Sequence, residues 1–109
     1  MARIVRIVLS NAFSVNMLKH DALLFFGQID LETVKTLVQD RFYSVIGHQS
    51  TADLLSAKLG VEIKLNRENY KKEKGDAIIV CLPNKRLEEG KVLSLEELNQ
   101  IDIKFWVIK

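Results

Sequence analysis

Two polar loops of the sequence carry side chains suited to acid–base or phosphate chemistry. The first is 47–51, Gly-His-Gln-Ser-Thr, which contains His48. The second is 85–91, Lys-Arg-Leu-Glu-Glu-Gly-Lys, which contains three cations, two carboxylates and a glycine. An imidazole can act as a general acid, and an arginine can stabilise charge on phosphoryl oxygens. If the two loops converge, the set suits phosphodiester chemistry without a metal.

A third loop, 10–14, runs from an expected strand straight into an expected helix. Helix N-termini present free backbone N–H groups and a partial positive charge, which favours phosphate. Plainer explanations remain open for these residues. A lone histidine such as His48 is more often a packed or surface residue, a charged loop such as 85–91 is usually just solvated, and Asn11 is a common turn residue.

The elements that position these loops follow from the hydrophobic pattern. The pattern predicts strands at 4–9, 22–29 (buried), 42–46, 61–65, 77–82 and 103–108. Capping residues predict helices at 14–19 after Ser14, at 31–41 after Asp30, from Ser50 with Asp53 in capping-box position to Gly60, and from Ser94. The alternation of strands and helices indicates an α/β fold. We expect a single small domain over residues 1–109, with a mixed sheet of about five strands and flanking helices.

Composition excludes several classes of protein. The 109 residues hold 16 basic and 14 acidic side chains, a net charge of +2, which is too small to coat nucleic acid by bulk charge. One cysteine, Cys81, cannot form an internal disulfide, and with two histidines it cannot build a Cys/His zinc cage. No apolar run approaches the length of a membrane span. We therefore expect a cytoplasmic protein that binds no membrane and needs neither metal nor cofactor.

Three segments taken together resemble the viral ring nuclease family, the type III anti-CRISPR proteins. They are 9–18 (LSNAFSVNML), 46–51 (IGHQST) and 86–94 (RLEEGKVLS), and the resemblance extends from about residue 7 to 109. It implies a small α/β homodimer. The implied activity is cleavage of cyclic tetra-adenylate, the second messenger that switches on CRISPR-associated nucleases.

The resemblance also assigns residues. Carried over by motif, the catalytic side chains are those of His48, Arg86 and Glu89. The ligand-binding residues it implies are Asn11, Ala12, Phe13, Ser14, Asn16, Gly47, Gln49, Ser50, Arg67 and Lys85, with Asn66 beside Arg67 as a weaker match. Family members often have glutamine where this chain has Lys85, so the resemblance does not imply the contact made by that glutamine here.

The residues themselves support the same chemistry. An RNA-like linkage carries its own nucleophile, the 2′-hydroxyl, so neither water nor metal is required if the pocket holds it in line with the phosphorus. His48 would protonate the departing 5′ oxygen and Arg86 would stabilise phosphoryl charge. Glu89 could fix either of these side chains or help to deprotonate the 2′-hydroxyl. The products would be linear di-adenylates ending in a 2′,3′-cyclic phosphate.

Two other classes of function remain open. One is a module that sequesters a cyclic oligonucleotide without cutting it. The other is a viral nucleic-acid-binding dimer, which needs a basic stripe and exposed aromatic rings. The small net charge, and the position of most aromatic residues in expected strands, speak against this last class and against double-stranded DNA as a partner.

Overall fold

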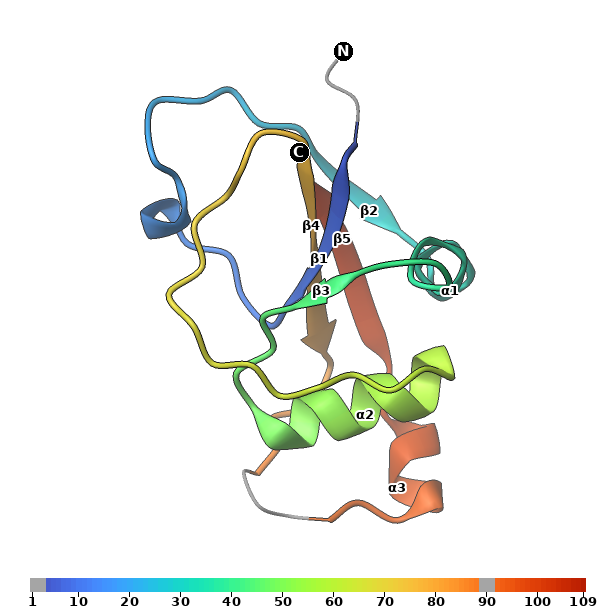
Figure 1. Cartoon of the computed structure of the whole chain (residues 1–109). Helices are drawn as coiled ribbons and strands as arrows, with labels where there is room; N and C mark the ends of the chain where they lie inside the picture. The colour runs from blue at the N-terminus through green and yellow to red at the C-terminus, as the bar shows by residue number, and fades with distance from the viewer. Residues whose placement is uncertain (1–3, 89–91) are drawn as a thin grey trace.

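The computed structural model of the chain describes residues 4–88 and 92–109 as a sheet with helices packed on it (Figure 1). The described strands are β1 (Arg6–Ser10), β2 (Phe26–Ile29), β3 (Tyr43–Ser44), β4 (Asp76–Pro83) and β5 (Ile103–Ile108). The helices are α1 (Leu31–Leu37), α2 (Gln49–Leu59) and α3 (Leu95–Gln100), with a short 3₁₀ turn, η1 (Val15–Met17). None of the helices in the described ranges is long and apolar enough to cross a membrane. The expected α/β class and mixed five-stranded sheet are confirmed.

The sheet has the strand order β2-β5-β4-β1-β3. Strand β1 runs parallel to β3 and β4, whereas β5 is antiparallel to both β4 and β2. The carboxyl ends of the three parallel strands β1, β3 and β4 therefore point the same way. Figure 1 shows α2 lying across this end of the sheet, with α3 next to it. Segments that leave this edge are the ones that can build a site.

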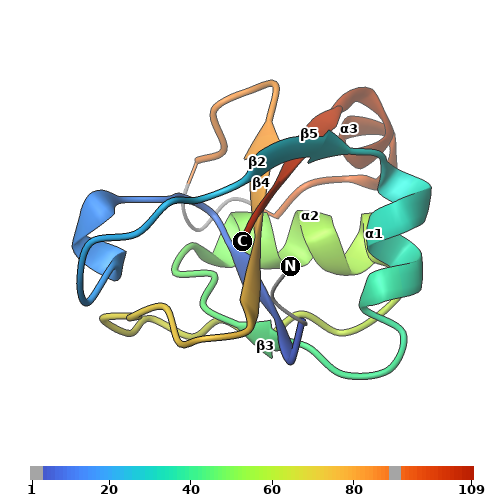
Figure 2. The same ribbon diagram turned by 90° about the horizontal axis from the view of Figure 1, so that it is seen from above.

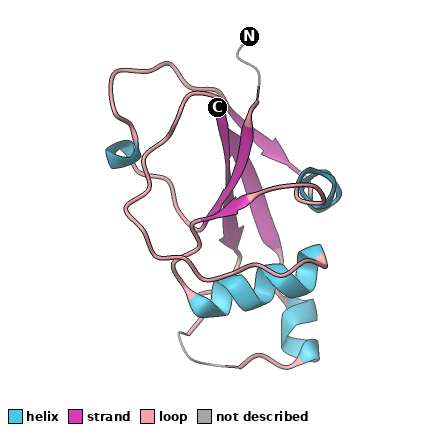
Figure 3. Ribbon diagram, viewed as in Figure 1, coloured by secondary structure: helices cyan, strands magenta, loops and turns pink. Residues whose placement is uncertain are grey.

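The two faces of the sheet are covered differently. Helices α1 and α2 pack on one face of the sheet. There their buried residues, Val34, Ala52, Leu55 and Leu59, join those of the strands in the larger core. The other face is covered by two long loops, which follow β1 and α2 and contribute residues such as Phe13 and Tyr70 (Figures 2 and 3). Helix ends carry the expected signals: Asp30 accepts from Thr33 N, Gly60 ends α2 at φ 72°, and Ser94 forms a capping box with Glu97.

The apolar segment 22–29 differs from its prediction as a buried strand. Only Phe26–Ile29 is a strand, and it is the outermost one, paired with β5 alone. Leu23 is fully exposed, and Phe25 and Phe26 are 57% and 51% exposed. An apolar run shows that a segment tends to be buried but not which strand lies at the edge.

The neighbourhood of β3 also differs from the sequence prediction. The strand has two residues instead of the expected five at 42–46, α1 ends at Leu37, and 61–65 is not a strand. Segment 64–66 still runs beside β3, but side chains make some of the links. The Ser44 hydroxyl donates to Lys64 O at 2.7 Å, and Asn66 N donates to Ile46 O at 2.8 Å. Irregular pairing of this kind leaves no ladder to recognise from alternation in the sequence.

Candidate functional site

The candidate site lies at the N-terminus of α2, at the carboxyl edge of the sheet. His48 is the N-cap residue and is half-buried, and Gln49 is the first helical residue. The expectation that Ser50 caps this helix is therefore wrong by two residues. Ser50 is instead buried inside the first turn, where its hydroxyl bonds another loop. Within the described part of the chain, no acidic residue lies in this turn and His48 makes no side-chain cap, which leaves the helix end suited to an anion.

Gly47 is held between two loops immediately before His48. Its N–H donates to Asn11 Oδ1 at 3.0 Å, and its carbonyl accepts from Arg67 Nε at 2.7 Å. Asn11 belongs to the loop that follows β1, and Arg67 to the loop that follows α2. The structure thus brings together Asn11, Gly47, His48 and Arg67, four of the residues that the sequence assigned to the site.

The loop that follows β4 is attached to the same helix end. The Ser50 hydroxyl donates to the carbonyl oxygen of Glu88 at 2.6 Å, and Ser50 is only 2% exposed. The third sequence block therefore meets the second at the first turn of α2. Glu89, predicted to be catalytic, lies outside the described residues.

Arg86 and Lys85 are exposed and line a hollow of about 220 Å³ between this loop and α3. Glu97 and Gln100 of α3 line the same hollow. Arg86 makes no hydrogen bond or ion pair with any other residue in the described ranges. Its long side chain is anchored to the site only through the backbone of the loop, which Ser50 fixes two residues further on.

Asn66 is a structural residue of the site that the sequence indicated only weakly. Its Nδ2 donates to Ser44 O and to Glu68 Oε1, both at 2.8 Å, and Glu68 also accepts from the Tyr43 hydroxyl. These bonds pin the loop beside β3 directly before Arg67. The sequence pointed to Asn66 only as part of an Asn-Arg pair. Its hydrogen-bond partners Ser44 and Glu68, and Tyr43 beside them, belong to no sequence motif.

Other predicted ligand residues make local contacts. Phe13 packs edge-to-face on Phe26, with ring centroids 5.7 Å apart. The Ser14 side chain caps η1 by accepting from Asn16 N at 3.2 Å, and Asn16 O accepts from Lys71. The remaining two bond within their own segments: Gln49 Nε2 donates to Asp53 at 2.8 Å, and Ala12 N donates to Ser10 Oγ at 3.2 Å.

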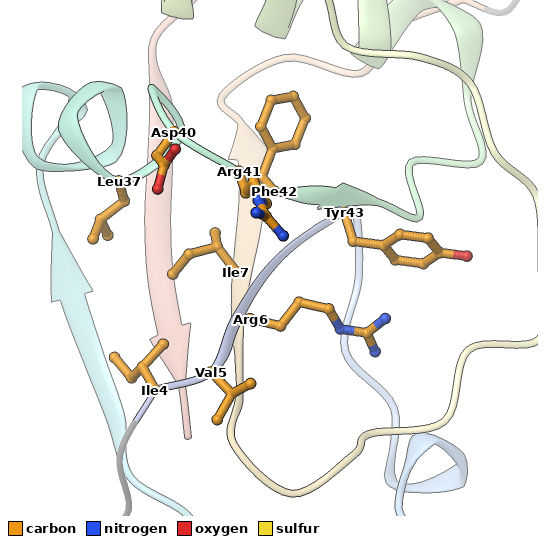
Figure 4. A pocket seen from close by; sticks show the side chains of 9 residues that line it. All are labelled: Ile4, Val5, Arg6, Ile7, Leu37, Asp40, Arg41, Phe42 and Tyr43. Carbon is orange, nitrogen blue, oxygen red and sulfur yellow. The ribbon is translucent and has the colours of Figure 1, made fainter.

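The hollow beside the Gly47 junction is small in a single chain. It has a volume of about 270 Å³ and is lined by Asn11, Gly47 and Arg67, together with neighbours that include Met17 and Tyr70. A larger hollow of about 910 Å³ lies at the amino end of β1, between α1 and β3 (Figure 4). It is lined mainly by apolar side chains such as Ile4, Ile7 and Leu37, so its size does not make it the better site for a phosphate.

A hydrogen-bonded ion pair lies at the amino end of β1. Arg6 Nε and Nη2 donate to the two carboxylate oxygens of Asp76 at 2.9 and 2.8 Å, and the Tyr70 hydroxyl donates to Asp76 as well. Burial opposes ionisation of Asp76, but the hydrogen bonds from Arg6, Tyr70 and Glu73 N outweigh it and hold its pKa below the ordinary value. Burial raises the pKa of Tyr70, and its bond to Asp76 raises it further. The cluster locks β1 to β4 and stays charged at neutral pH.

Cys81 does not contribute a nucleophile to the site. It is fully buried in the core on the helix-covered face, and burial raises the pKa of its thiol to about 12. A thiolate is the reactive form of cysteine, so this side chain is inert at neutral pH. Among the described residues no group of three or more metal-ligating side chains lies together.

Comparisons with known proteins relate this chain to proteins of several viruses. The profile of the STIV B116-like family matches residues 7–105. Protein 26 of Sulfolobus islandicus filamentous virus is 37% identical over 84 residues, covering 75% of this chain and 71% of its own length. Protein ORF116 of Acidianus filamentous virus 1 is 37% identical over 95 residues, covering 85% and 82%. The solved structure of B116 of Sulfolobus turreted icosahedral virus matches with a TM-score of 0.77 and 31% identity over 95% of this chain and 98% of that one.

Proposed function

The chain belongs to the STIV B116-like family, and from this premise and the site at α2 we propose that it is a metal-independent ring nuclease. The proposed substrate is cyclic tetra-adenylate, whose 3′–5′ linkages are cleaved by their own 2′-hydroxyls. The products are linear di-adenylates with a 2′,3′-cyclic phosphate. The proposed outcome is that type III CRISPR signalling is switched off in the cytoplasm of the cell.

One observation carries this proposal. The three sequence blocks that resemble ring nucleases follow three different elements, β1, β3 and β4, and they meet at the N-terminus of α2. Asn11 bonds Gly47, and Ser50 bonds Glu88. Ligands of open α/β sheets bind at the carboxyl edge of parallel strands, where these blocks meet, and a helix N-terminus at that edge is a natural place for a phosphate.

In the proposed mechanism the helix end and the pocket donors hold one phosphate of the ring. Holding the 2′-hydroxyl in line with the phosphorus supplies much of the rate enhancement, because the nucleophile is already part of the substrate. His48, as imidazolium, donates its proton to the 5′ oxygen as the P–O bond breaks. Its Nδ1 lies 3.5 Å from Thr51 Oγ1, a contact that restrains the ring without using Nε2.

Arg86 supplies positive charge to the phosphoryl oxygens as the transition state forms. Its exposure and its position on a loop fixed through Ser50 leave its side chain available to an arriving anion. Glu89, next along the chain after Glu88, is proposed to orient Arg86 or His48 or to assist deprotonation of the 2′-hydroxyl.

A homodimer is part of the proposal. A cyclic tetranucleotide has pseudo-two-fold symmetry, so two copies of the chain could cradle it on their axis and offer two equivalent sites. The small hollow of about 270 Å³ beside Gly47 in one chain agrees with a ring that is shared between two chains. Sedimentation of the protein with and without the ring would measure this state directly.

The test is incubation of the purified protein with cyclic tetra-adenylate in excess EDTA, with products identified by mass spectrometry. The proposal expects complete conversion to species of di-adenylate mass with a cyclic phosphate terminus. Recovery of the intact ring from tight complexes would instead establish a module that sequesters the messenger. Cleavage that disappears in EDTA would contradict the metal-independent mechanism.

A further inference from the structure

The peptide groups on both sides of Gly47 are fixed by side chains from elsewhere in the fold. Asn11 Oδ1 accepts from Gly47 N at 3.0 Å, which fixes the peptide between Ile46 and Gly47. Arg67 Nε donates to Gly47 O at 2.7 Å, which fixes the peptide between Gly47 and His48. The backbone that enters the N-cap of α2 is thus held from two directions.

Arg67 and Asn11 both lie close to Gly47. A Cβ built on Gly47 would lie 3.4 Å from Arg67 Cγ and 4.0 Å from Asn11 Oδ1. These are ordinary van der Waals distances, so the two hydrogen bonds, and not the missing side chain, hold the Gly47 backbone in place. The chemistry of the bond also fixes the orientation of the Asn11 amide, since only its oxygen can accept from an N–H.

We infer that Asn11 is a positioning residue, which acts through the Gly47 peptide to place the imidazole of His48. This inference rests on the proposed function and goes beyond the ligand-binding role that the sequence resemblance implies for Asn11. The Thr51 hydroxyl, 3.5 Å from Nδ1, restrains the rotation of the imidazole, and the position of the residue that carries the ring is set by the backbone on either side of Gly47. A shift of about 1 Å in a reacting group can cost roughly a hundredfold in rate, so this backbone bond bears on catalysis.

Asn11→Asp separates positioning from ligand binding. A carboxylate oxygen can still accept from Gly47 N, whereas the amide N–H₂ that a ligand contact would need is lost. Asn11→Ala removes both. Asn11 is exposed, so neither variant should disturb the fold, and Asn99→Ala, an exposed site on α3, is the matched control.

The experiment measures single-turnover cleavage at saturating cyclic tetra-adenylate, so that weaker ground-state binding does not enter. We expect Asn11→Ala to be slower by about 10- to 100-fold and Asn99→Ala to be unchanged. Asn11→Asp should be faster than Asn11→Ala, although its negative charge near the phosphate keeps it below wild type. Amide hydrogen exchange of Gly47, followed in glycine-labelled protein without any ring, gives a readout independent of catalysis. The chain has only five glycines, and we expect protection in wild type and Asn11→Asp but not in Asn11→Ala.

Two results would overturn the inference. One is an Asn11→Ala variant that is slow although its Gly47 amide is as protected as in wild type, because the lost amide group would then act on the ligand and not through the backbone. The other is an Asn11→Ala variant that cleaves at the wild-type rate. Failure of the wild type to cleave is distinct from both, since it contradicts the proposed function itself.

Discussion

The hydroxyl of Ser50 donates a 2.6 Å hydrogen bond to the carbonyl oxygen of Glu88, joining the first turn of α2 to the loop that follows β4. The two residues are 38 positions apart in the sequence. Ser50 is buried, so its hydroxyl is shielded from water, and the bond fixes the loop backbone two residues beyond Arg86. Ser50, which looks like a helix cap in the sequence, thus helps to set the position of the charged loop that carries Arg86.

Ser50→Ala should therefore loosen the loop that carries Arg86. We expect a loss of about 1 kcal/mol of unfolding free energy, because the Glu88 carbonyl is left without this donor. We also expect the single-turnover cleavage rate to fall by roughly tenfold, because the backbone that carries Arg86 is no longer held in place. Urea unfolding and single-turnover cleavage measure the two effects.

Ser56→Ala is the matched control on the same helix. Its hydroxyl donates to Ala52 O at 2.7 Å and accepts from Ile63 N at 2.9 Å, away from the candidate site. It should cost a similar unfolding free energy without lowering the cleavage rate. An equal loss of cleavage rate in Ser50→Ala and Ser56→Ala would show that the rate falls because the fold is destabilised, and not because Arg86 is displaced.

Arg86→Ala should lower both the cleavage rate and the affinity for the ring. The guanidinium meets the phosphate before and during the reaction, so we expect a rate loss of about 10²–10³-fold together with weaker equilibrium binding. Arg41→Ala, an exposed arginine beside the hollow at the amino end of β1, should change neither. Full activity in Arg86→Ala, measured beside this control, would remove Arg86 from the mechanism.

Asp76→Asn should destabilise the fold and change its response to acid. Asp76 is 3% exposed, so the substitution removes a buried charge that Arg6 pairs with. Because Arg6 is 37% exposed and water can solvate the cation that is left, we expect a cost of about 1–2 kcal/mol. Because the folded pKa of Asp76 is lowered, the stability it confers is present above its unfolded pKa, roughly 3.9, and is lost as the pH falls through the folded value. The difference between wild type and variant in urea unfolding should thus be large at pH 6 and shrink below about pH 4.

The carboxylate of Asp53 provides the comparison for Asp76. It is exposed on α2 and accepts only from Gln49 among the described residues, so Asp53→Asn should change the unfolding free energy by less than about 0.5 kcal/mol. A wild-type to Asp76→Asn difference that does not vary with pH would contradict the assigned ionisation of Asp76.

Gly60→Ala should destabilise α2 at its C-terminal end. Gly60 has φ 72°, a left-handed conformation that costs an L-residue about 1–2 kcal/mol, although a Cβ there would meet nothing within 4 Å. Asn tolerates this region better, so Gly60→Asn should cost less than Gly60→Ala. Thermal unfolding of the two variants would reveal the order, and equal stability of Gly60→Ala and wild type would contradict the backbone explanation.

Local sequence signals predicted the parts of the fold that depend on local chemistry. The caps at Asp30, Gly60 and Ser94 and the strand 103–108 have the expected positions because capping and alternation are short-range properties. Ser50 was misassigned because a serine near a helix start can bond either its own helix or another segment, and only the fold decides which. The edge position of β2 likewise follows from strand order, which no local pattern encodes.

The residues of the candidate site also differ in how far the sequence alone reveals them. His48 and Arg86 stand out because few residue types can transfer protons or bind phosphate tightly. Gly47 and Asn11 stood out only as members of a motif, and their shared hydrogen bond depends on where the loops after β1 and β3 meet. The clamp formed by Asn66, Glu68 and Tyr43 has no sequence signature, because its bonds span up to 25 positions and use common polar residues.

The most direct test of the central claim is single-turnover cleavage of cyclic tetra-adenylate by His48→Ala, measured beside its equilibrium binding of the ring. The general acid is needed only as the bond breaks, so we predict a rate lower by about 10²–10⁴-fold with affinity nearly unchanged. His20→Ala, which removes the other, exposed histidine, should behave as wild type. Cleavage by His48→Ala at the wild-type rate would contradict the assignment of His48 as the general acid.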